Sequence, residues 1–366
     1  MAETAADHFS HRVTLKDVAA KAKLSIASVS LALRDHPRLP ERTRKRVKRI
    51  ATELGYAPDP ALSALAAHRS RVRVFRDFSV VGLVSNWSTR DAWVNLPSAK
   101  QFIEGATERA RELGYSLQHL WAQQDGASPA RFSRILQARG IRGLVLAPFE
   151  NPDEPFKLDW KSFSVVTNER ANPYAQFHHI TPNHYGDLLL CWEQLRKRGF
   201  TRVGLAVRRD LASRWSHQWE AAHAYAQSHS DKRIEPVPTL ELSLDNQIAE
   251  IRHWIRTNRP QVVIGRCDNF IEAAAAEGLR VPKDIGYVSL NIIDDMPNAT
   301  GIDQHRDVMG ATAIDVLNSL LQRNQRGPQP ASIGTQVDGT WHEGATLGQG
   351  STPQRRKTAP PKRRRA

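Results

Sequence analysis

Residues 13–69 read VTLKDVAAKAKLSIASVSLALRDHPRLPERTRKRVKRIATELGYAPDPALSALAAHR, and the helix signals in this stretch decide the fold of the N-terminal part of the chain. Thr14 followed by Asp17 three residues later has the pattern of a capping box, and apolar residues then recur at helical spacing. Ser25 is a favourable N-cap for a second helix over residues 26–33. Two short helices joined by a tight turn predict a helix-turn-helix.

The second helix of a helix-turn-helix enters the major groove of DNA, so its outward face decides which bases are contacted. Helical spacing turns Val29, Ala32 and Leu33 toward the protein interior. The side chains expected on the outward face are those of Ala27, Ser28, Leu31 and Arg34.

A third helix is expected over residues 41–54, where Gly55 supplies a C-terminal stop. Its apolar stripe consists of Val47, Ile50, Ala51 and Leu54. Its other face carries Arg42, Arg44, Lys45, Arg46, Lys48 and Arg49. A merely solvated face would have interspersed acids, but only Glu41 and Glu53 interrupt this run. We therefore favour contact with DNA phosphates for part of this face over a purely solvated surface.

The net charge of +14 is concentrated at the two ends of the chain. Residues 1–75 carry +8, residues 351–366 carry +7, and residues 76–350 carry only −1. This distribution is expected if at least one end of the chain meets a polyanion while the middle does not. The tail is rich in proline and basic residues and has no apolar periodicity, so it is expected to be disordered.

The N-terminal stretch resembles the DNA-binding headpiece of the LacI/GalR bacterial transcriptional repressors. The matching pieces are T-x-x-D-V-A at residue 14, S-x-x-S-V-S at residue 25, T-R-x-R-V, E-L-G-Y and the P-x-x-x-x-x-L of a hinge helix. The resemblance implies a homodimer that binds a pseudo-palindromic operator in double-stranded DNA and responds to a small effector. It implies DNA contacts by Thr14, Leu15, Ser25, Ile26, Ala27, Ser28, Ser30, Leu31, Arg34, Leu62 and Leu65.

The expected hinge helix covers residues 59–69, with Asp59 as N-cap and Pro60 at the first helical position. Its apolar segment is about eight residues long, and helices this short are marginal alone in water, so we expect order only when another element holds it. By resemblance, Leu65 is the leucine that wedges the minor groove open.

The recognition helix departs from the family at the positions that read bases. Leu31 stands where many members carry an arginine, and Ile26 and Ala27 are apolar. Such side chains contact thymine methyl groups but make no bidentate hydrogen bonds to guanine or adenine. We therefore expect weaker direct readout, with more weight on DNA shape, hinge insertion and Arg34. Pro40 replaces a usual capping Ser or Thr, at little cost because proline can begin a helix.

From residue 78 onward, buried strands alternate with helices, which predicts βαβ units and parallel sheets. The strands are expected at SVVGLVS, YSLQHLW, GLVLAPF, FSVVT, RVGLAV, PQVVIGRC and IGYVSL. The helices are expected at residues 99–113, 129–139, 187–198, 214–229, 244–257 and 270–277. This much chain needs two doubly wound subdomains with a cleft between them. Segments such as LRVPKDIGYVSL and TGIDQHRDVMG resemble the family's periplasmic-binding-protein-like effector domain.

The predicted organisation combines an all-α helix-turn-helix headpiece and hinge helix with an α/β effector domain. Its parts are a flexible arm (1–11), the DNA-binding domain (12–58), the hinge helix (59–69), the effector-binding and dimerisation domain (76–350) and the basic tail (351–366). Within the effector domain, one subdomain is expected to comprise residues 76–168 plus 291–325, and the other residues 169–290 plus 326–350.

Ligands of doubly wound sheets bind beyond the carboxyl ends of the strands, which places the effector in the cleft. The candidate effector-binding residues are Ser85, Trp87, Asn168, Arg208, Arg214, Asp268 and Asn291. A sugar or related metabolite is favoured by the resemblance. Asn291 stands where sugar-binding members often have an aspartate, and Cys267 precedes Asp268 where they have an asparagine, which leaves the ligand open. His178, His179 and His184 have no zinc-site spacing and are interpreted as loop residues.

No run of about 18 apolar residues is present, the N-terminus lacks a signal-peptide core, and the two cysteines fit ordinary reduced thiols. We therefore expect a cytoplasmic, nucleoid-associated bacterial protein without membrane contact. We find no G-x-S-x-G motif, P-loop or metal-ligand spacing, so we expect neither an enzyme nor a cofactor. A transporter's solute-binding protein would lack the headpiece. A DNA-binding regulator or architectural protein without a ligand remains the alternative.

Overall fold

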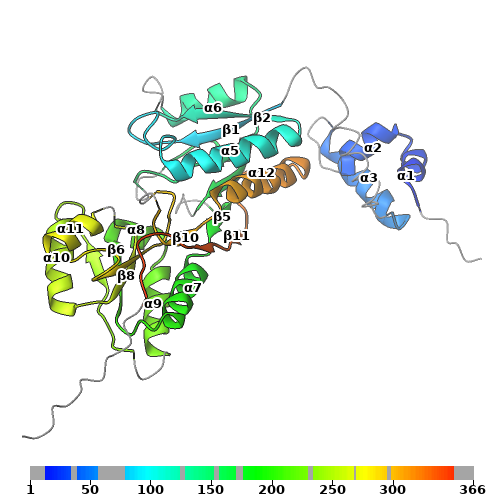
Figure 1. Cartoon of the computed structure of the whole chain (residues 1–366). Helices are drawn as coiled ribbons and strands as arrows, with labels where there is room; N and C mark the ends of the chain where they lie inside the picture. Colours follow the sequence, from blue (N-terminus) through cyan, green and yellow to red (C-terminus); the bar gives the residue numbers. More distant parts are fainter. Residues whose placement is uncertain are drawn as a thin grey trace, which may run out of the picture.

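The computed structural model describes residues 13–33, 39–56, 79–123, 128–151, 156–169, 176–229, 234–267, 269–294 and 298–349. The expected arm, hinge helix and basic tail lie outside these residues, as do Arg34, Leu62, Leu65 and Asp268. Within them, the chain forms a helical headpiece followed by two α/β subdomains (Figure 1).

The headpiece consists of α1 (Leu15–Ala22), α2 (Ile26–Leu33) and α3 (Glu41–Glu53). The backbone N–H and the hydroxyl of Thr14 donate to the Asp17 carboxylate at 2.8 and 2.7 Å, which caps α1 as predicted. The backbone N–H of Ser28 donates to the Ser25 hydroxyl at 3.1 Å and so caps α2. Val18, Val29, Val47 and other small apolar side chains pack into one core, so the three helices form a unit.

The first subdomain is built on a sheet whose strands follow the order β11 (Gly334–Val337), β5 (His178–Pro182), β4 (Ser164–Asn168), β3 (Gly143–Leu146), β1 (Ser79–Ser85), β2 (Tyr115–Trp121). All of these neighbours pair in parallel. One face is covered by α5 (Pro97–Glu112) and α12 (Arg306–Gln322), and the other by α6 (Pro129–Ala138) (Figure 1). A short 3-10 helix, η2 (Trp160–Ser162), precedes β4.

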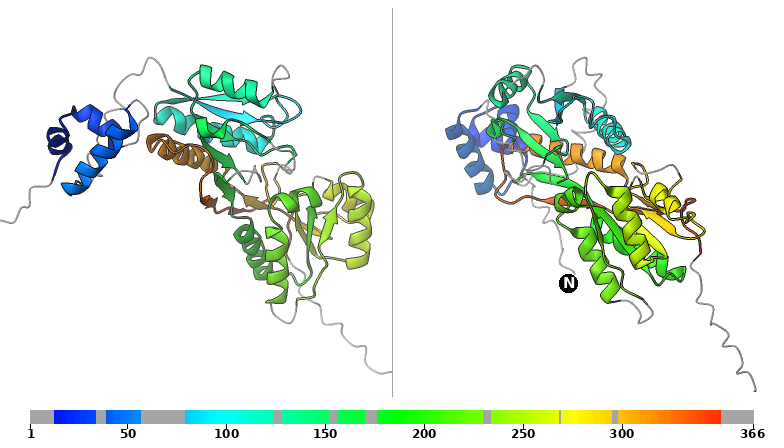
Figure 2. Two further views of the ribbon diagram at one scale, coloured as in Figure 1. Left: turned by 180° about the vertical axis from the view of Figure 1, so that it is seen from behind. Right: turned by 90° about the vertical axis from the view of Figure 1, so that its left-hand side faces the viewer.

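The second subdomain is built on a sheet with the order β12 (Thr340–His342), β10 (Gly301–Asp303), β9 (Gly286–Ser289), β8 (Val262–Gly265), β6 (Val203–Arg208), β7 (Leu240–Leu242). Its pairs are parallel except that between β10 and β12. Figure 2 shows helices on both faces. These are α7 (His184–Lys197), α8 (Arg209–Arg214) and α9 (Gln218–Ser228) on one face, and α10 (Gln247–Asn258) and α11 (Phe270–Ala276) on the other.

Both sheets have helices on both faces, as the predicted fold class requires. The boundaries between the subdomains differ from those expected. Strand β5 extends the first sheet beyond residue 168, β10 belongs to the second sheet, and β11 returns to the first. The division at residues 168, 291 and 325 is therefore corrected. Strands β5 and β10 each continue the sheet of the preceding strand, β4 and β9, whereas β11 pairs with β5, which lies 155 residues earlier. His178 and His179 lie on β5 and His184 begins α7, so the interpretation of these three histidines as loop residues is wrong.

Three connections join the subdomains, and hydrogen bonds hold them side by side. The Asn183 side-chain amide donates to Asp338 at 2.8 Å, which ties the β5–α7 connection to the β11–β12 connection. Thr340 and His305 form a hydrogen bond of 2.9 Å between the β11–β12 and β10–α12 connections. The backbone N–H of Gly339 donates to Asp187 at 2.9 Å. These bonds hold the three connections together at one place between the subdomains.

Helices α5 and α12 cross in backbone contact through two glycines. A Cβ atom on Gly310 would lie 2.0 Å from the Phe102 carbonyl oxygen, and one on Gly105 would lie 2.0 Å from that of Asp307. We expect Gly310→Ala to lower the free energy of unfolding by about 1–3 kcal/mol, although alanine has the higher helix propensity. Urea unfolding measures this change. Thr107→Ala, on the exposed side of α5, should change stability by less than about 0.5 kcal/mol.

Candidate functional site

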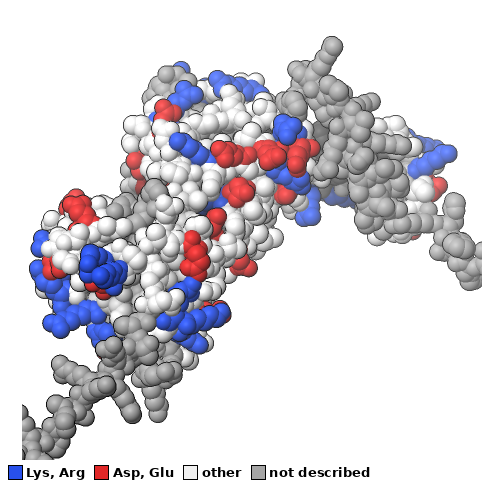
Figure 3. Space-filling view, viewed as in Figure 1, with Lys and Arg blue, Asp and Glu red and all other residues white. Residues whose placement is uncertain are grey.

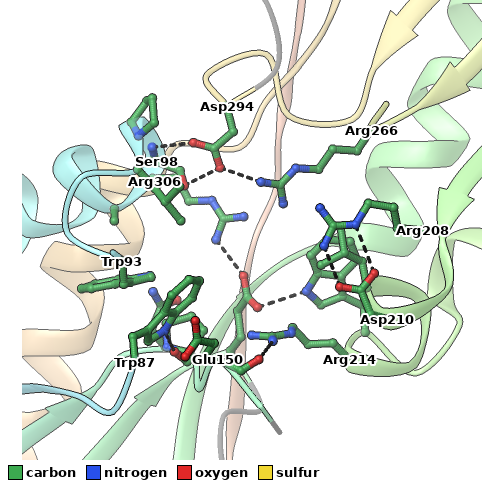
Figure 4. A pocket seen from close by; sticks show the side chains of 18 residues that line it. Trp87, Trp93, Ser98, Glu150, Arg208, Asp210, Arg214, Arg266, Asp294 and Arg306 are labelled. Carbon is green, nitrogen blue, oxygen red and sulfur yellow. Dashed lines mark hydrogen bonds and ion pairs between the residues drawn. The ribbon is translucent and has the colours of Figure 1, made fainter. Parts of the chain in front are cut away.

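A cavity of about 490 Å³ lies between the subdomains, beyond the carboxyl ends of the strands (Figure 4). It is lined by Trp87, Trp93, Leu96, Pro97, Ser98, Ala99, Pro148, Glu150, Asn168, Glu169, Arg208, Asp210, Leu211, Arg214, Trp215, Arg266, Asp294 and Arg306. Its volume is in the range of small-molecule sites. Both subdomains contribute to it, so a ligand here would contact both.

A buried ion pair forms one end of the cavity. Glu169 follows β4 with a positive φ of 62°, which turns its side chain toward the first residue of α12, Arg306. Its carboxylate accepts from Arg306 at 3.0 Å and from the Trp215 indole N–H at 3.0 Å. Arg306 also donates to Gln304 at 2.7 Å. Because Trp215 belongs to the second subdomain, Glu169 links the two sides of the cleft.

Burial and charge act in opposite directions on Glu169. Burial raises its pKa, but the nearby Arg306 and Arg214 guanidiniums and the Trp215 hydrogen bond outweigh burial and lower the pKa to about 2. The carboxylate is therefore ionised at neutral pH. His184, packed against Trp215 with ring centroids 4.8 Å apart, has its pKa lowered to about 3 by burial and by Arg306 and Arg266. Its imidazole is therefore neutral at neutral pH.

The lowered pKa of Glu169 predicts a pH dependence of stability. The folded-state pKa of about 2 lies below the ordinary value of 4.5, so the contribution of this group is complete above about pH 4.5 and is lost as the pH falls toward 2. We expect the stability difference between wild type and Glu169→Gln to shrink by on the order of 1–3 kcal/mol over this range. Urea unfolding at several pH values measures it, and a constant difference would contradict the lowered pKa.

Asp294 closes a second link across the cleft. Its carboxylate accepts from the backbone N–H and the hydroxyl of Ser98, at 2.8 and 2.5 Å, at the start of α5. The same carboxylate accepts from Arg266 and from the Asn291 amide, each at 3.0 Å. Ser98 belongs to the first subdomain and Asp294 to the second. This polar link is therefore a second tie between the two sides of the cleft.

The segment expected as one helix over residues 214–229 is interrupted in the structure. Ser216 and His217 both have positive φ, so α8 ends at Arg214 and α9 begins at Gln218. The interruption directs Arg214 and Trp215 into the cavity (Figure 4). Arg214 donates to the Glu150 backbone carbonyl at 3.1 Å, which adds a third contact between the subdomains.

Comparisons with known proteins identify the family of a chain with this architecture. Residues 14–59 match the profile of "Bacterial regulatory proteins, lacI family", and residues 192–339 match that of the "Periplasmic binding protein-like domain". The HTH-type transcriptional repressor CytR of Escherichia coli (strain K12) is 45% identical over 329 residues, which cover 86% of this chain and 91% of that protein. The chain belongs to the LacI family.

More distant relatives agree with this assignment. The HTH-type transcriptional repressor PurR of Aliivibrio fischeri (strain MJ11) is 23% identical over 340 residues, 83% of this chain and 90% of that protein. Two solved structures share the fold at 19% identity, and each match covers 92% of this LacI-family chain and 100% of the other chain. They are the transcriptional regulator CelR–cellobiose complex, with a TM-score of 0.57, and the Lac repressor dimer bound to operator and the anti-inducer ONPF, with a TM-score of 0.52.

LacI-family proteins are DNA-binding transcription regulators controlled by small molecules, so this chain is a regulator and not an enzyme. In the described part of this LacI-family chain, no helix is both long enough and apolar enough to span a bilayer. Among the same residues, no three potential metal ligands gather at an ion site. Cys191 and Cys267 are both buried thiols.

The cavity of this LacI-family chain contains four of the predicted effector residues. Trp87, Asn168, Arg208 and Arg214 line it. Ser85 and Asn291 are buried behind it, where Ser85 bonds to His119 at 2.8 Å and Asn291 supports Asp294. Asp268 lies outside the described residues.

The predicted set omitted residues that now define the cavity: Ser98, Glu169, Arg266, Asp294 and Arg306. Glu169 directly follows β4 and Arg266 directly follows β8, two strands that the sequence did indicate, so the rule that located Asn168 also applies to them. Arg306 begins α12, which is not among the helices expected from the sequence. Ser98 is the second residue of α5, which begins at Pro97, two residues before the expected start.

Helix α2 presents a mostly apolar surface. Ile26 is 50% exposed and Ala27 is also exposed, whereas Leu31 is half-buried. Val29 and Ala32 are buried and Leu33 is half-buried, as the helical spacing predicted. Thr14 and Ser25 are exposed, and Leu15, Ser28 and Ser30 are half-buried. The assignment of these residues to DNA contact stays a prediction.

The basic face of α3 is partly neutralised within the headpiece. Lys45 pairs with Glu41 at 2.8 Å and Arg49 with Glu53 at 3.5 Å, while Arg46 donates to the Ala22 carbonyl at 2.6 Å. Arg42, Lys45 and Lys48 are exposed. In Figure 3 the effector domain instead shows basic and acidic side chains interspersed. Glu41 and Glu53 therefore neutralise part of the basic face of α3, and the rest of that face keeps the positive charge expected of a phosphate contact.

Proposed function

We propose that this LacI-family chain binds a pseudo-palindromic DNA operator as a homodimer and represses transcription. A small molecule in the inter-subdomain cavity controls that binding. The observation that carries the proposal is that Glu169, Asp294 and Arg214 each link the two subdomains around one cavity. A ligand among these links changes the balance between open and closed clefts.

Control of DNA binding follows from the position of the three connections between the subdomains. The three adjacent connections allow the subdomains to rotate about them, and rotation alters the spacing of the two hinge segments in a dimer. A short hinge helix forms only at the spacing at which it pairs with its mate. Coupling of this kind corresponds to about 1–3 kcal/mol and acts equally on ligand and operator affinity.

The apolar surface of α2 suggests how the operator is read. Ile26 and Ala27 are suited to thymine methyl groups, and Leu65 in the hinge segment is placed by resemblance to wedge the minor groove. We propose that the protein acts on the bacterial nucleoid in the cytoplasm. A sugar-like metabolite is the ligand class that the resemblance favours.

A mobility-shift titration tests the proposed control. Operator affinity of the full chain should change about 5- to 150-fold on addition of the ligand, and operator DNA should change ligand affinity by the same factor. Sugars, sugar acids and nucleosides are the compounds to screen, first by thermal shift. If compounds bind but none changes operator affinity, the chain is a DNA binder without ligand control.

A further inference from the structure

The two walls of the cavity have different chemistry. The first subdomain contributes an aromatic and apolar wall that includes Trp87, Trp93 and Pro148. The second contributes Arg208, Arg214 and Arg266, whose guanidinium groups point toward the cavity from the other side (Figure 4). A ligand that fills the space between them therefore meets rings on one side and cations on the other.

The acids of the described lining are already occupied by internal donors. Both carboxylate oxygens of Glu169 accept hydrogen bonds, from Arg306 and Trp215. Asp210 accepts two bonds from Arg208, and Glu150 accepts two from Ser88. Asp294 accepts four. These acids thus offer little capacity to accept from ligand hydroxyl groups.

The arginines of the same lining retain unused donors. Arg266 donates through Nη2 to Asp294, and its Nε and Nη1 have no partner among the described residues. Its side chain is 22% exposed, so it is accessible from the cavity. Arg214 uses Nη2 for the Glu150 backbone carbonyl, and its Nε has no hydrogen-bond partner in the described part of the chain. A guanidinium carries five N–H donors, so both arginines have spare capacity.

The charged groups of the lining thus offer more donors than acceptors, and the Asn168 amide oxygen is an uncharged acceptor that remains unpartnered. This balance selects among ligand classes. Each hydroxyl of a neutral sugar brings a proton that needs an acceptor, whereas a carboxylate only accepts hydrogen bonds. Carboxylate–guanidinium bonds are also about twice as strong as neutral ones. Flat faces of rings, saturated or aromatic, pack well on tryptophan. The site therefore suits a ring on one side and an anion on the other.

We propose that the effector is a small ring-bearing carboxylate. Its ring packs against Trp87 and Trp93, and its carboxylate accepts hydrogen bonds from Arg214 and Arg266. The proposal rests on the proposed function, because it takes the cavity to be the effector site. Such a ligand contacts both subdomains and stabilises the closed cleft.

Matched pairs of compounds test the charge requirement on the full chain. Isothermal titration at constant pH and ionic strength compares D-glucuronate with D-glucose and benzoate with benzyl alcohol. We expect at least one carboxylate to bind, and to bind at least about tenfold more tightly than its neutral partner. Arg266→Gln should weaken the binding of that carboxylate by at least about 30-fold and leave the affinity for the neutral compound unchanged.

Two further variants keep the test decisive. Arg214→Gln should reproduce the loss, which covers the case in which Arg266→Gln disturbs Asp294, and circular dichroism checks that both variants fold. Arg196→Gln, exposed on α7 of the same subdomain, is the charge-matched control and should leave affinity unchanged. A carboxylate that binds equally well to all variants would overturn the proposal.

The remaining outcomes separate this proposal from the proposed function. If neutral sugars or nucleosides bind as tightly as the carboxylates and shift operator affinity, the cavity is an effector site but the anionic assignment is wrong. If no compound of either kind binds or shifts operator affinity, the anionic ligand class and the control by a ligand are both wrong. Operator binding by the headpiece is tested separately, by the DNase protection experiment described below.

Discussion

Glu169→Gln is expected to lower the free energy of unfolding by about 3–5 kcal/mol, more than any other single change considered for the effector domain. Glu169 and Arg306 are 6% and 5% exposed, so water cannot replace the lost charge. The glutamine amide would also place a donor against either the Arg306 guanidinium or the Trp215 indole, where the structure has two donors facing an acceptor. Arg306 would be left as an uncompensated buried cation.

A double-mutant cycle separates this pair from its surroundings. Urea unfolding of Glu169→Gln, Arg306→Gln and the double variant gives the coupling energy, which we expect to be about 1–3 kcal/mol. The double variant should therefore be less destabilised than the sum of the single variants. Glu104→Gln, at an exposed position of α5, makes the same change in charge without touching the pair and should stay close to wild type. Additive single effects would show that the two side chains are independent.

Ile26→Glu is expected to weaken operator binding by at least about 30-fold while leaving the headpiece folded. The loss combines the missing burial of an apolar side chain against the bases, worth about 1.5–3 kcal/mol when complete, with repulsion between the new carboxylate and DNA phosphates. Stability should be kept because Ile26 is 50% exposed and is the first residue of α2, where the helix dipole favours an acid. Fluorescence anisotropy with operator DNA measures the affinity.

The matched control is Thr107→Glu, which makes the same change in net charge on an exposed position of α5 in the effector domain. It should alter operator affinity by less than about threefold, because screening removes most of its effect at physiological salt. An equal loss in both variants would mean that net charge, and not the position of residue 26, governs binding. Unchanged binding by Ile26→Glu would remove α2 from the operator contact.

The headpiece was predictable because its signals are local. The Thr14–Asp17 cap, the Ser25 cap and the apolar spacing act within a few residues, and all three helices begin at their expected residues. The alternation of strands and helices likewise gave the fold class. The allocation of β11 to the first sheet was not predictable in this way, because it depends on pairing with β5, which lies 155 residues earlier in the sequence. Strands β5 and β10 are only five and three residues long, and the sequence pattern did not predict them as strands.

The candidate site was predictable to the extent that strand ends define it. Trp87, Asn168 and Arg208 follow buried strands closely, so the general rule for doubly wound sheets located them. Glu169 and Arg306 are 137 residues apart, and neither position alone indicates that they form a buried pair. The function of Arg214 depends on the helix interruption at Ser216 and His217, which the polar sequence there did not reveal.

The central claim is that α2 and the hinge segment bind a specific DNA sequence. DNase protection by the purified full chain on fragments of its own genome, at low salt and with or without candidate metabolites, tests it most directly. We expect a protected pseudo-palindrome whose half-sites lie about one helical turn apart, and loss of protection with Ile26→Glu. No protected site on any fragment under either condition would contradict the account.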